Sequence, residues 1–215
     1  MEKGKIVMIK LVNILEKVDD VVDRIEQEIF RFNFLQKRYY KSERQKPGYK
    51  RELARLLPIV KKLGFEKAKE IDKVVRKYTA TTYGRMNKSL RADKVPVNAT
   101  QIDQYIEVAP KFTGSELYRG IGKELYQTII TAKSKNFIDK AFMSATKDYA
   151  TAEHFAGRTG KGTVLVLTGA IKKAAQAPQS VAFDDEEGEA EYIFPRNTQM
   201  KIIKIEGEKI FVKVL

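Results

Sequence analysis

Two glutamates spaced one residue apart, Glu189 and Glu191, have the types and spacing to carry out chemistry. The apolar run 192–194 that follows them is typical of a β-strand. Because residues i and i+2 of a strand point to the same face, both carboxylates would face one site. Neighbouring carboxylates repel each other, and a fold tolerates that cost more readily where the pair stabilises a cation or accepts a proton. On this segment alone a solvated acidic turn is the better explanation, since residues 184–187 are also acidic.

The composition argues against several other kinds of catalytic site. The 215 residues include no cysteine, so we expect no disulfide, no thiolate nucleophile and no zinc site built on cysteine. His154 is the only histidine, which disfavours a triad or metal centre built on imidazoles, and we interpret it as a helix surface residue. The hydrophobic content of 43% indicates a globular protein. The length suits one domain, with or without a helical appendage.

The positive charge of the chain is concentrated in one region. The formal net charge is +13, and residues 37–76 hold 14 Lys and Arg against 5 Asp and Glu, a net of +9. Such a surface attracts polyanions, for example nucleic acid or an acidic protein. A solvated pair of helices explains the same charges equally well. The cations that would form the surface are Lys41, Arg44, Lys46, Lys50, Arg51 and Arg55.

No segment of the sequence is typical of a membrane span or a signal peptide. No apolar run approaches the roughly 20 residues that cross a bilayer. The apolar-rich residues 6–15 are interrupted by Lys10 and are not followed by a small-residue cleavage site. We therefore predict no membrane association. The expected location is the cytoplasm, or a target cell that the protein reaches without such a signal.

The elements that would position the two glutamates change in kind along the chain. The first hundred or so residues carry apolar side chains at three- and four-residue steps, which indicates amphipathic helices. Beyond Pro110 short apolar strands dominate, and this order predicts an α+β fold. The expected helices cover residues 6–46, 49–63, 66–90, 98–105, 122–135 and 148–157. The expected strands cover 116–119, 141–144, 163–167, 200–205 and 209–214, with a polar loop over 172–188.

Three further segments change the interpretation of the glutamate pair. They are residues 117–120 (LYRG), 142–146 (FMSAT) and 155–158 (FAGR), each at an expected strand or helix. Together with the Glu-x-Glu pair, their order and spacing resemble the mono-ADP-ribosyltransferases of the arginine–serine–glutamate type. The chain is most similar to the bacterial toxin branch, which includes the clostridial binary toxins and the Rho-modifying exoenzymes. Residues 78–91 resemble the helix that precedes the catalytic sheet in that branch.

The resemblance covers about residues 65–215 and implies a fold and a division of the chain. The implied fold has two small packed, mostly antiparallel sheets that form an NAD cleft, preceded by a group of α-helices. Residues 1–64 would be an N-terminal helical segment packed on or next to the catalytic domain, residues 65–215.

The resemblance also implies a reaction, in which ADP-ribose moves from NAD⁺ to an acceptor and nicotinamide is released without a metal. The transition state of such a reaction resembles an oxocarbenium ion, which a fixed negative group stabilises. Glu191 would be that group, and Ser144 would hydrogen-bond Glu191 to fix its rotamer. Glu189 would orient the acceptor and take its proton. Glu187 with Glu189 is a competing pair, but the strand after Glu191 favours the pair 189 and 191.

Several further residues are implied to contact the substrates. Arg119 would bind the NAD phosphates or brace the site beneath them, because a planar guanidinium suits a diphosphate. Phe155 would stack on nicotinamide, although a core aromatic on a helix is a competing interpretation, and Phe183 would contribute to acceptor recognition. Ala141 stands where some relatives carry an asparagine that contacts NAD. The implied NAD-binding set is Arg119, Gly120, Tyr78, Tyr83, Asn87, Arg91, Phe155 and Arg158.

The acceptor is left open by the sequence. A glutamate at position 189 goes with arginine acceptors in the family, and a carboxylate pairs well with a guanidinium. The basic region and the missing export signal favour instead a base of RNA or DNA, as in an intracellular toxin with a neutralising antitoxin. A third alternative is a non-catalytic module with the same fold. The presence of Arg119, Ser144 and Glu191 together argues against that alternative.

Overall fold

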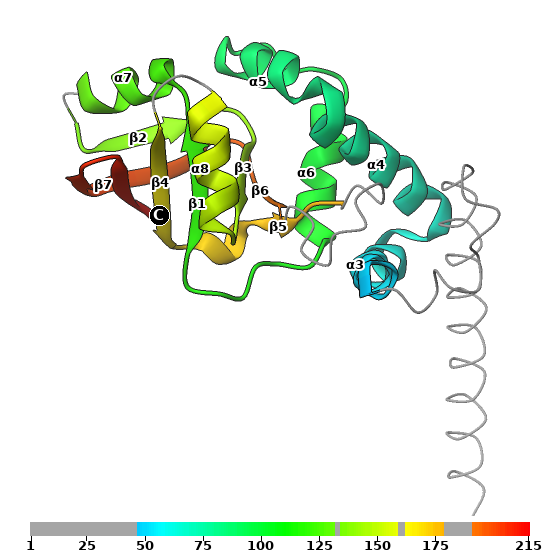
Figure 1. The fold of residues 1–215 in the computed structure, drawn as a ribbon. Helices are drawn as coiled ribbons and strands as arrows, with labels where there is room; N and C mark the ends of the chain where they lie inside the picture. Colours follow the sequence, from blue (N-terminus) through cyan, green and yellow to red (C-terminus); the bar gives the residue numbers. More distant parts are fainter. Residues whose placement is uncertain (1–46, 132–133, 159–161, 179–190) are drawn as a thin grey trace, which may run out of the picture. The chain divides into compact units, whose positions relative to one another are not determined.

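The computed structural model describes residues 47–131, 134–158, 162–178 and 191–215 (Figure 1). The chain divides into two compact units, Met1–Ala68 and Lys69–Leu215. The helix expected over residues 6–46 lies outside the described residues. The proposed boundary between an N-terminal segment and a catalytic domain after residue 64 stays a prediction.

The helices follow the expected apolar spacing but differ in one respect. Gly64, with φ at +77°, ends the first helix in the left-handed conformation that suits glycine. The single helix expected over 66–90 is in fact two α-helices separated by a π-helical turn. The helices before the sheet are α3 (Pro47–Leu63), α4 (Phe65–Lys77), the π turn η2 (Tyr78–Thr82), α5 (Tyr83–Arg91) and α6 (Ala99–Val108).

The second unit is built on a sheet whose described strands form one continuous order, β2-β7-β8-β4-β1-β3-β6-β5. The α+β class is confirmed, and among the described strand pairs only β4–β8 is parallel. We expected two separate sheets, whereas the described strands form one hydrogen-bonded sheet. The strands are β1 (Leu117–Ile121), β2 (Asn136–Asp139), β3 (Met143–Thr146), β4 (Thr163–Gly169), β5 (Ala175–Gln176), β6 (Glu191–Phe194), β7 (Thr198–Glu206) and β8 (Lys209–Val214). The helices α7 (Lys123–Thr131) and α8 (Tyr149–Arg158) and the 3₁₀ turn η3 (Ile171–Lys173) lie between strands.

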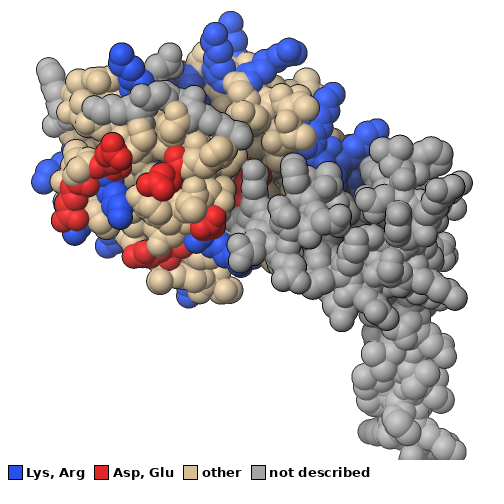
Figure 2. Space-filling view, viewed as in Figure 1, with Lys and Arg blue, Asp and Glu red and all other residues tan. Residues whose placement is uncertain are grey.

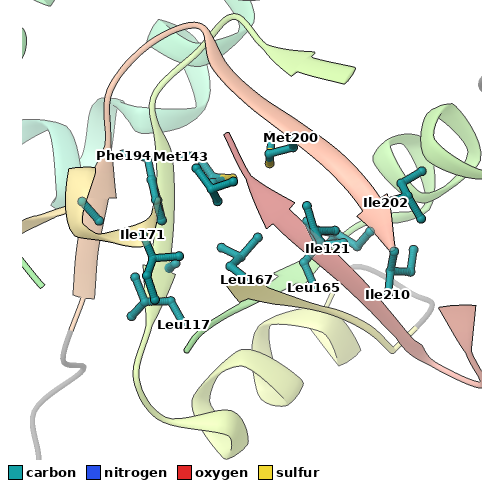
Figure 3. Close-up of a cluster of buried hydrophobic side chains, with 14 of the residues drawn as sticks. Leu117, Ile121, Met143, Leu165, Leu167, Ile171, Phe194, Met200, Ile202 and Ile210 are labelled. Atoms are coloured by element: carbon teal, nitrogen blue, oxygen red, sulfur yellow. The ribbon is translucent and has the colours of Figure 1, made fainter. Parts of the chain in front are cut away.

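The chain connectivity requires this sheet to curl back on itself. β6 and β7 are five strand spacings apart in the order, which would be about 24 Å in a flat sheet. The link from Phe194 to Thr198 spans only four Cα steps, at most about 14 Å. The two ends of the sheet must therefore face each other, and a single apolar cluster fills the space between them. Figure 3 shows Met143 from one end beside Met200 from the other, and Phe194 and Ile202 belong to the same cluster.

Helix α8 covers the other face of the central strands. It packs on β1, β3 and β4, where its Ala152 and Ala156 are buried with Val164. Small alanines on the helix allow this close approach of helix and sheet. Nowhere in the described part of the chain is a helix long and apolar enough to cross a membrane.

Candidate active site

The pairing of β3 with β6 places the predicted catalytic serine and glutamate on one face of the sheet. Glu191, the first residue of β6, lies opposite Thr146, and Ser144 is two residues from Thr146 on the same strand. Directly opposed residues and residues two apart share a face, so all three side chains project to the same side. Met143 and Ala145 project to the other side, into the apolar cluster. The hydrogen bond expected between Ser144 and Glu191 stays a prediction.

Tyr78 joins the helical part of the site to these strands. Its side chain is fully buried and its ring packs edge-on against Phe142 at 5.6 Å between centroids. The Asn87 Nδ2 donates a hydrogen bond to the Tyr78 hydroxyl at 3.1 Å, and the side chain of Ser144 lies close enough to influence the pKa of the same hydroxyl. Burial raises the pKa of Tyr78 to about 12, and the nearby charge of Glu191 adds to this effect. At neutral pH Tyr78 is therefore an uncharged hydroxyl with its proton in place.

Arg119 lies in β1 beside this group and has unused hydrogen-bonding capacity. Its Nη1 donates to the backbone carbonyl of Ser144 at 2.6 Å. Its Nε is buried and has no hydrogen-bond partner among the residues that the structure describes. Burial lowers the pKa of the guanidinium, and the nearby groups Asp139, Tyr78 and Glu191 act in the opposite direction. A buried donor without a partner costs free energy, which a bound anion would recover.

Arg91 is engaged by a residue that the sequence analysis missed. Its Nε and Nη2 donate to the two carboxylate oxygens of Asp139 at 3.1 and 2.9 Å. Asp139 is 6% exposed and also accepts a hydrogen bond from the Ala141 N–H at 3.0 Å. The pair thus connects α5 to the end of β2 and to the segment before β3. The role of Arg91 as an NAD contact stays a prediction, and its bidentate pairing gives it a bracing role as well.

Gly120 is a glycine for a reason that sequence reasoning did not identify. A Cβ at this position would clash with the backbone oxygen of Ala152 and would lie 2.5 Å from the backbone nitrogen of Ala156. The helix α8 therefore rests directly on β1 at this point. This contact fixes the part of α8 that carries Phe155, whose side chain is 39% exposed. The implied role of Gly120 in NAD binding stays a prediction.

The remaining predicted residues lie apart from the buried group or outside the described residues. Tyr83 is the first residue of α5 and is 55% exposed. Arg158 ends α8, and its side chain lies outside the described part. Glu189 and Phe183 also lie outside it. Of the cations expected to form a basic surface, Arg55 is fully buried. The side chains of the other five, Lys41, Arg44, Lys46, Lys50 and Arg51, are outside the described part.

The sequence held little signal for the missed residues. Asp139 ends a four-residue strand that was not expected, and Phe142 reads as an ordinary strand residue. Within the described ranges no group of three or more acidic or histidine side chains is arranged to hold a metal ion. The site thus offers a half-buried guanidinium with a buried Nε, a neutral phenol, one amide, one hydroxyl and a carboxylate. This set suits an anionic substrate that develops a cation next to Glu191.

Comparison with known proteins gives matches at the level of family and fold. The model of the ADP-ribosyltransferase exoenzyme family matches residues 43–213. Comparison with curated protein sequences gives no match. Among solved structures, Vis toxin, an ADP-ribosyltransferase from Vibrio splendidus, is similar at a TM-score of 0.51 and 17% identity, over 68% of this chain and 73% of that chain.

Two further solved structures carry small molecules. Vis in complex with agmatine matches at a TM-score of 0.50 and 17% identity, over 67% of this chain and 73% of that one. Exoenzyme S from Pseudomonas aeruginosa, in complex with human 14-3-3 protein beta and bound to carba-NAD, matches at a TM-score of 0.51 and 12% identity. That match covers 66% of this chain and 72% of the other.

Proposed function

Because this chain belongs to the ADP-ribosyltransferase exoenzyme family, we propose that it transfers ADP-ribose to the side chain of a protein arginine. Membership makes the chain an NAD⁺-dependent ADP-ribosyltransferase, which sets aside the alternative of a non-catalytic module. The observation that carries the site assignment is the buried Arg119 Nε without a described partner, beside Ser144 and Tyr78. It supports a role for Arg119 in holding the NAD diphosphate.

The proposed chemistry uses the two glutamates in different steps. The bond between ribose C1′ and the nicotinamide nitrogen breaks, and nicotinamide leaves with the electron pair. Glu191 stabilises the positive charge that develops on the ribose. A guanidinium nitrogen of the acceptor then bonds to C1′ and gives its proton to Glu189. The Glu-x-Glu assignment and the acceptor class are both parts of this proposal.

The role of Glu191 is tested by removing its charge without changing its size. The Glu191→Gln variant should lose on the order of a hundredfold in kcat, with little change in KM for NAD⁺. The measurement is transfer of labelled ADP-ribose to agmatine, whose guanidinium makes it a minimal arginine-like acceptor. Glu107→Gln, at an exposed position of α6, is the matched control and should remain active. Near-normal labelling by Glu191→Gln would show that the assignment is wrong.

The role of Glu189 is tested by comparing transfer with hydrolysis. Glu189 acts on the acceptor in this proposal, so Glu189→Gln should lose transfer to agmatine. Slow release of nicotinamide into water should persist in the same variant. Equal loss of both activities would mean that Glu189 acts on NAD⁺ itself, or that the true pair is Glu187 and Glu189.

A second candidate acceptor, a base of RNA or DNA, is favoured by one surface of the second unit. Five exposed cations on and just after α4 and α5 form no salt bridge with any residue in the described ranges, whereas Arg91 on the same segment pairs with Asp139. Figure 2 shows blue side chains gathered over these helices, whereas red and blue side chains are mixed over the sheet. The cations, here called the α4–α5 ridge, are Lys73, Lys77, Arg85, Lys88 and Lys94.

The two acceptors are distinguished by the fate of the label. Cell extract treated with the enzyme and labelled NAD⁺ is divided between protease and nuclease digestion. Label released only by protease supports the arginine proposal, and label released only by nuclease overturns it. A neutralising antitoxin stays a prediction from the sequence.

A further inference from the structure

The helical segment that carries Tyr78 and Asn87 contains a turn of a different kind between them. α4 ends at Lys77, the π turn η2 covers Tyr78–Thr82, and α5 begins at Tyr83. The N–H of Tyr83 donates to the carbonyl of Tyr78, five residues earlier, rather than to a carbonyl four residues earlier as in an α-helix. Single π turns are rare, and they occur frequently at functional sites.

The π turn decides which way Asn87 points. In an uninterrupted α-helix, nine residues at about 100° each place Asn87 roughly 180° from Tyr78 around the axis. The π turn takes up one extra residue, which leaves roughly 80° between them. The side chains of Asn87 and Tyr78 are 7% and 0% exposed, and they form a hydrogen bond of 3.1 Å. The π turn therefore brings onto one side two polar groups that an α-helix would hold on opposite sides.

Two buried apolar residues of the same segment are affected by the same change in angle around the helix axis. Ile71 of α4 and Leu90 of α5 are 0% and 4% exposed. Without the extra residue they would be roughly 100° apart around the axis, and with it they are nearly aligned. The burial of α5 and the contact of Asn87 with Tyr78 thus depend on the same extra residue.

Two threonine side chains within the π turn stabilise it by hydrogen bonds to the backbone. Thr81 Oγ1 and Thr82 Oγ1 both donate to the carbonyl of Lys77, at 3.1 and 3.2 Å. A helical threonine ordinarily reaches a carbonyl three or four residues earlier. Thr82 reaches back five residues, which is the spacing of a π turn. Thr79 bonds the Arg76 carbonyl at 3.1 Å, three residues earlier, which an ordinary α-turn also allows.

We propose that Thr81 and Thr82 are positioning residues for the NAD site, acting by holding the π turn that turns Asn87 toward Tyr78. This proposal rests on the proposed function, because it takes Asn87 and Tyr78 as part of the NAD site. The two threonines touch no substrate. Their effect passes through the rotation of α5.

The test removes both hydroxyls and keeps the side-chain shape. Thr81→Val with Thr82→Val should weaken NAD⁺ binding about fivefold, the size expected for loss of one neutral hydrogen bond. The measurement is the Kd of NAD⁺ by titration calorimetry, with Tm recorded in parallel. Thr79→Val is the matched control, since it removes a hydroxyl bond that does not depend on the π turn. Restoring one hydroxyl, as Thr81→Val with Thr82→Ser, should recover most of the affinity.

Repeating the threonine substitutions in the Asn87→Ala variant separates a positioning role from a general loss of stability. In the Asn87→Ala protein the contact is already absent, so removing the two hydroxyls should not weaken NAD⁺ binding further. Unchanged affinity in the double valine variant, or an equal loss in the Asn87→Ala background, would overturn the proposal. If Asn87→Ala itself binds NAD⁺ as tightly as the wild type, the site assignment is wrong. That result would contradict the proposed NAD site, whereas unchanged affinity in the double valine variant would contradict only the role of the threonines.

Discussion

At the scale of single residues, the site is assembled around the buried side chain of Tyr78 and the half-buried side chain of Arg119, whose Nε is buried. Both lose solvation on folding, and each recovers only part of the cost through hydrogen bonds within the protein. Tyr78 forms a side-chain hydrogen bond with Asn87, whereas Arg119 donates to one backbone carbonyl. Arg119 therefore recovers less of its desolvation cost through hydrogen bonds than Tyr78 does, and a bound diphosphate would supply the missing hydrogen bond.

The burial of Tyr78 gives the protein a specific sensitivity to alkali. The pKa of Tyr78 is raised to about 12 when folded, whereas an unfolded tyrosine has a pKa of about 10. The unfolded chain therefore loses this proton first, and the free energy of unfolding falls between about pH 10 and pH 12, by about 3 kcal/mol in total. Below about pH 10 both states hold the proton and the contribution is fully present.

The measurement is chemical denaturation of the wild type and of Tyr78→Phe at about pH 9 and about pH 11.5. The wild type should lose more stability over this interval than Tyr78→Phe, which has no proton to release. Tyr83→Phe, at an exposed tyrosine, should behave like the wild type. Parallel losses in all three proteins would contradict the prediction.

At the scale of elements, the close contact of α8 with β1 determines how the strands of the site are covered. Gly120→Ala places a methyl group against the backbone of α8, and backbone atoms cannot rotate away. We expect this change to lower the free energy of unfolding by about 2–3 kcal/mol.

Gly157→Ala provides the matched control within α8. No atom lies within 4 Å of a Cβ at position 157, so the change should be neutral or stabilising by up to about 1 kcal/mol. Thermal unfolding of the two variants measures the difference. Equal stability of Gly120→Ala and the wild type would show that α8 is not packed as closely as the structure describes.

How far the elements could be predicted depended on their length and regularity. The amphipathic spacing of α3 and α6 and the apolar run of β4 were long enough to predict from sequence, and the structure confirms them. β2 and β5 were missed because they have four and two residues, too few to show a period. The π turn was missed because Thr-Ala-Thr-Thr at 79–82 reads as part of an ordinary helix. The joining of the strands in one curled sheet depends on long-range pairing that no local pattern specifies.

The site was more predictable than the sheet because its residues were matched one by one to a family. The structure brings Tyr78, Asn87, Arg119 and Ser144 together, and Glu191 lies on the strand beside Ser144. The roles of these residues stay predictions. Asp139 could not be predicted, since a single aspartate carries no pattern of its own. Whether Glu189 faces the same site stays a prediction.

At the scale of the whole molecule, exposed cations gather over α4 and α5, whereas both charge signs are found over the sheet (Figure 2). The α4–α5 ridge lies on the same helical segment as Tyr78 and Asn87, but its side chains are exposed whereas those two are buried. Binding of a polyanion to the ridge and binding of NAD⁺ to the site should therefore be separable.

This separation predicts the behaviour of a charge-reversed variant. Changing Lys77, Arg85 and Lys88 to glutamate should weaken binding to a single-stranded RNA probe and reduce its salt slope by about 2. Transfer to agmatine should change little. Fluorescence anisotropy at several salt concentrations gives the slope. Lys201 and Lys213, exposed on β7 and β8, serve as the control pair. An equal loss from the control reversals would show that the ridge has no special role.

The place of β8 in the sheet also has a consequence for the time at which activity arises during synthesis. β8 is the last described strand in the chain, yet it lies between β4 and β7 and joins the two ends of the sheet. Its Ile210, Val212 and Val214 complete the apolar cluster on which β3 and β6 rest. A ribosome exposes the chain from its N-terminus, so a nascent chain that already displays Glu191 still lacks the support that holds it. Activity should therefore begin only after β8 has joined the sheet.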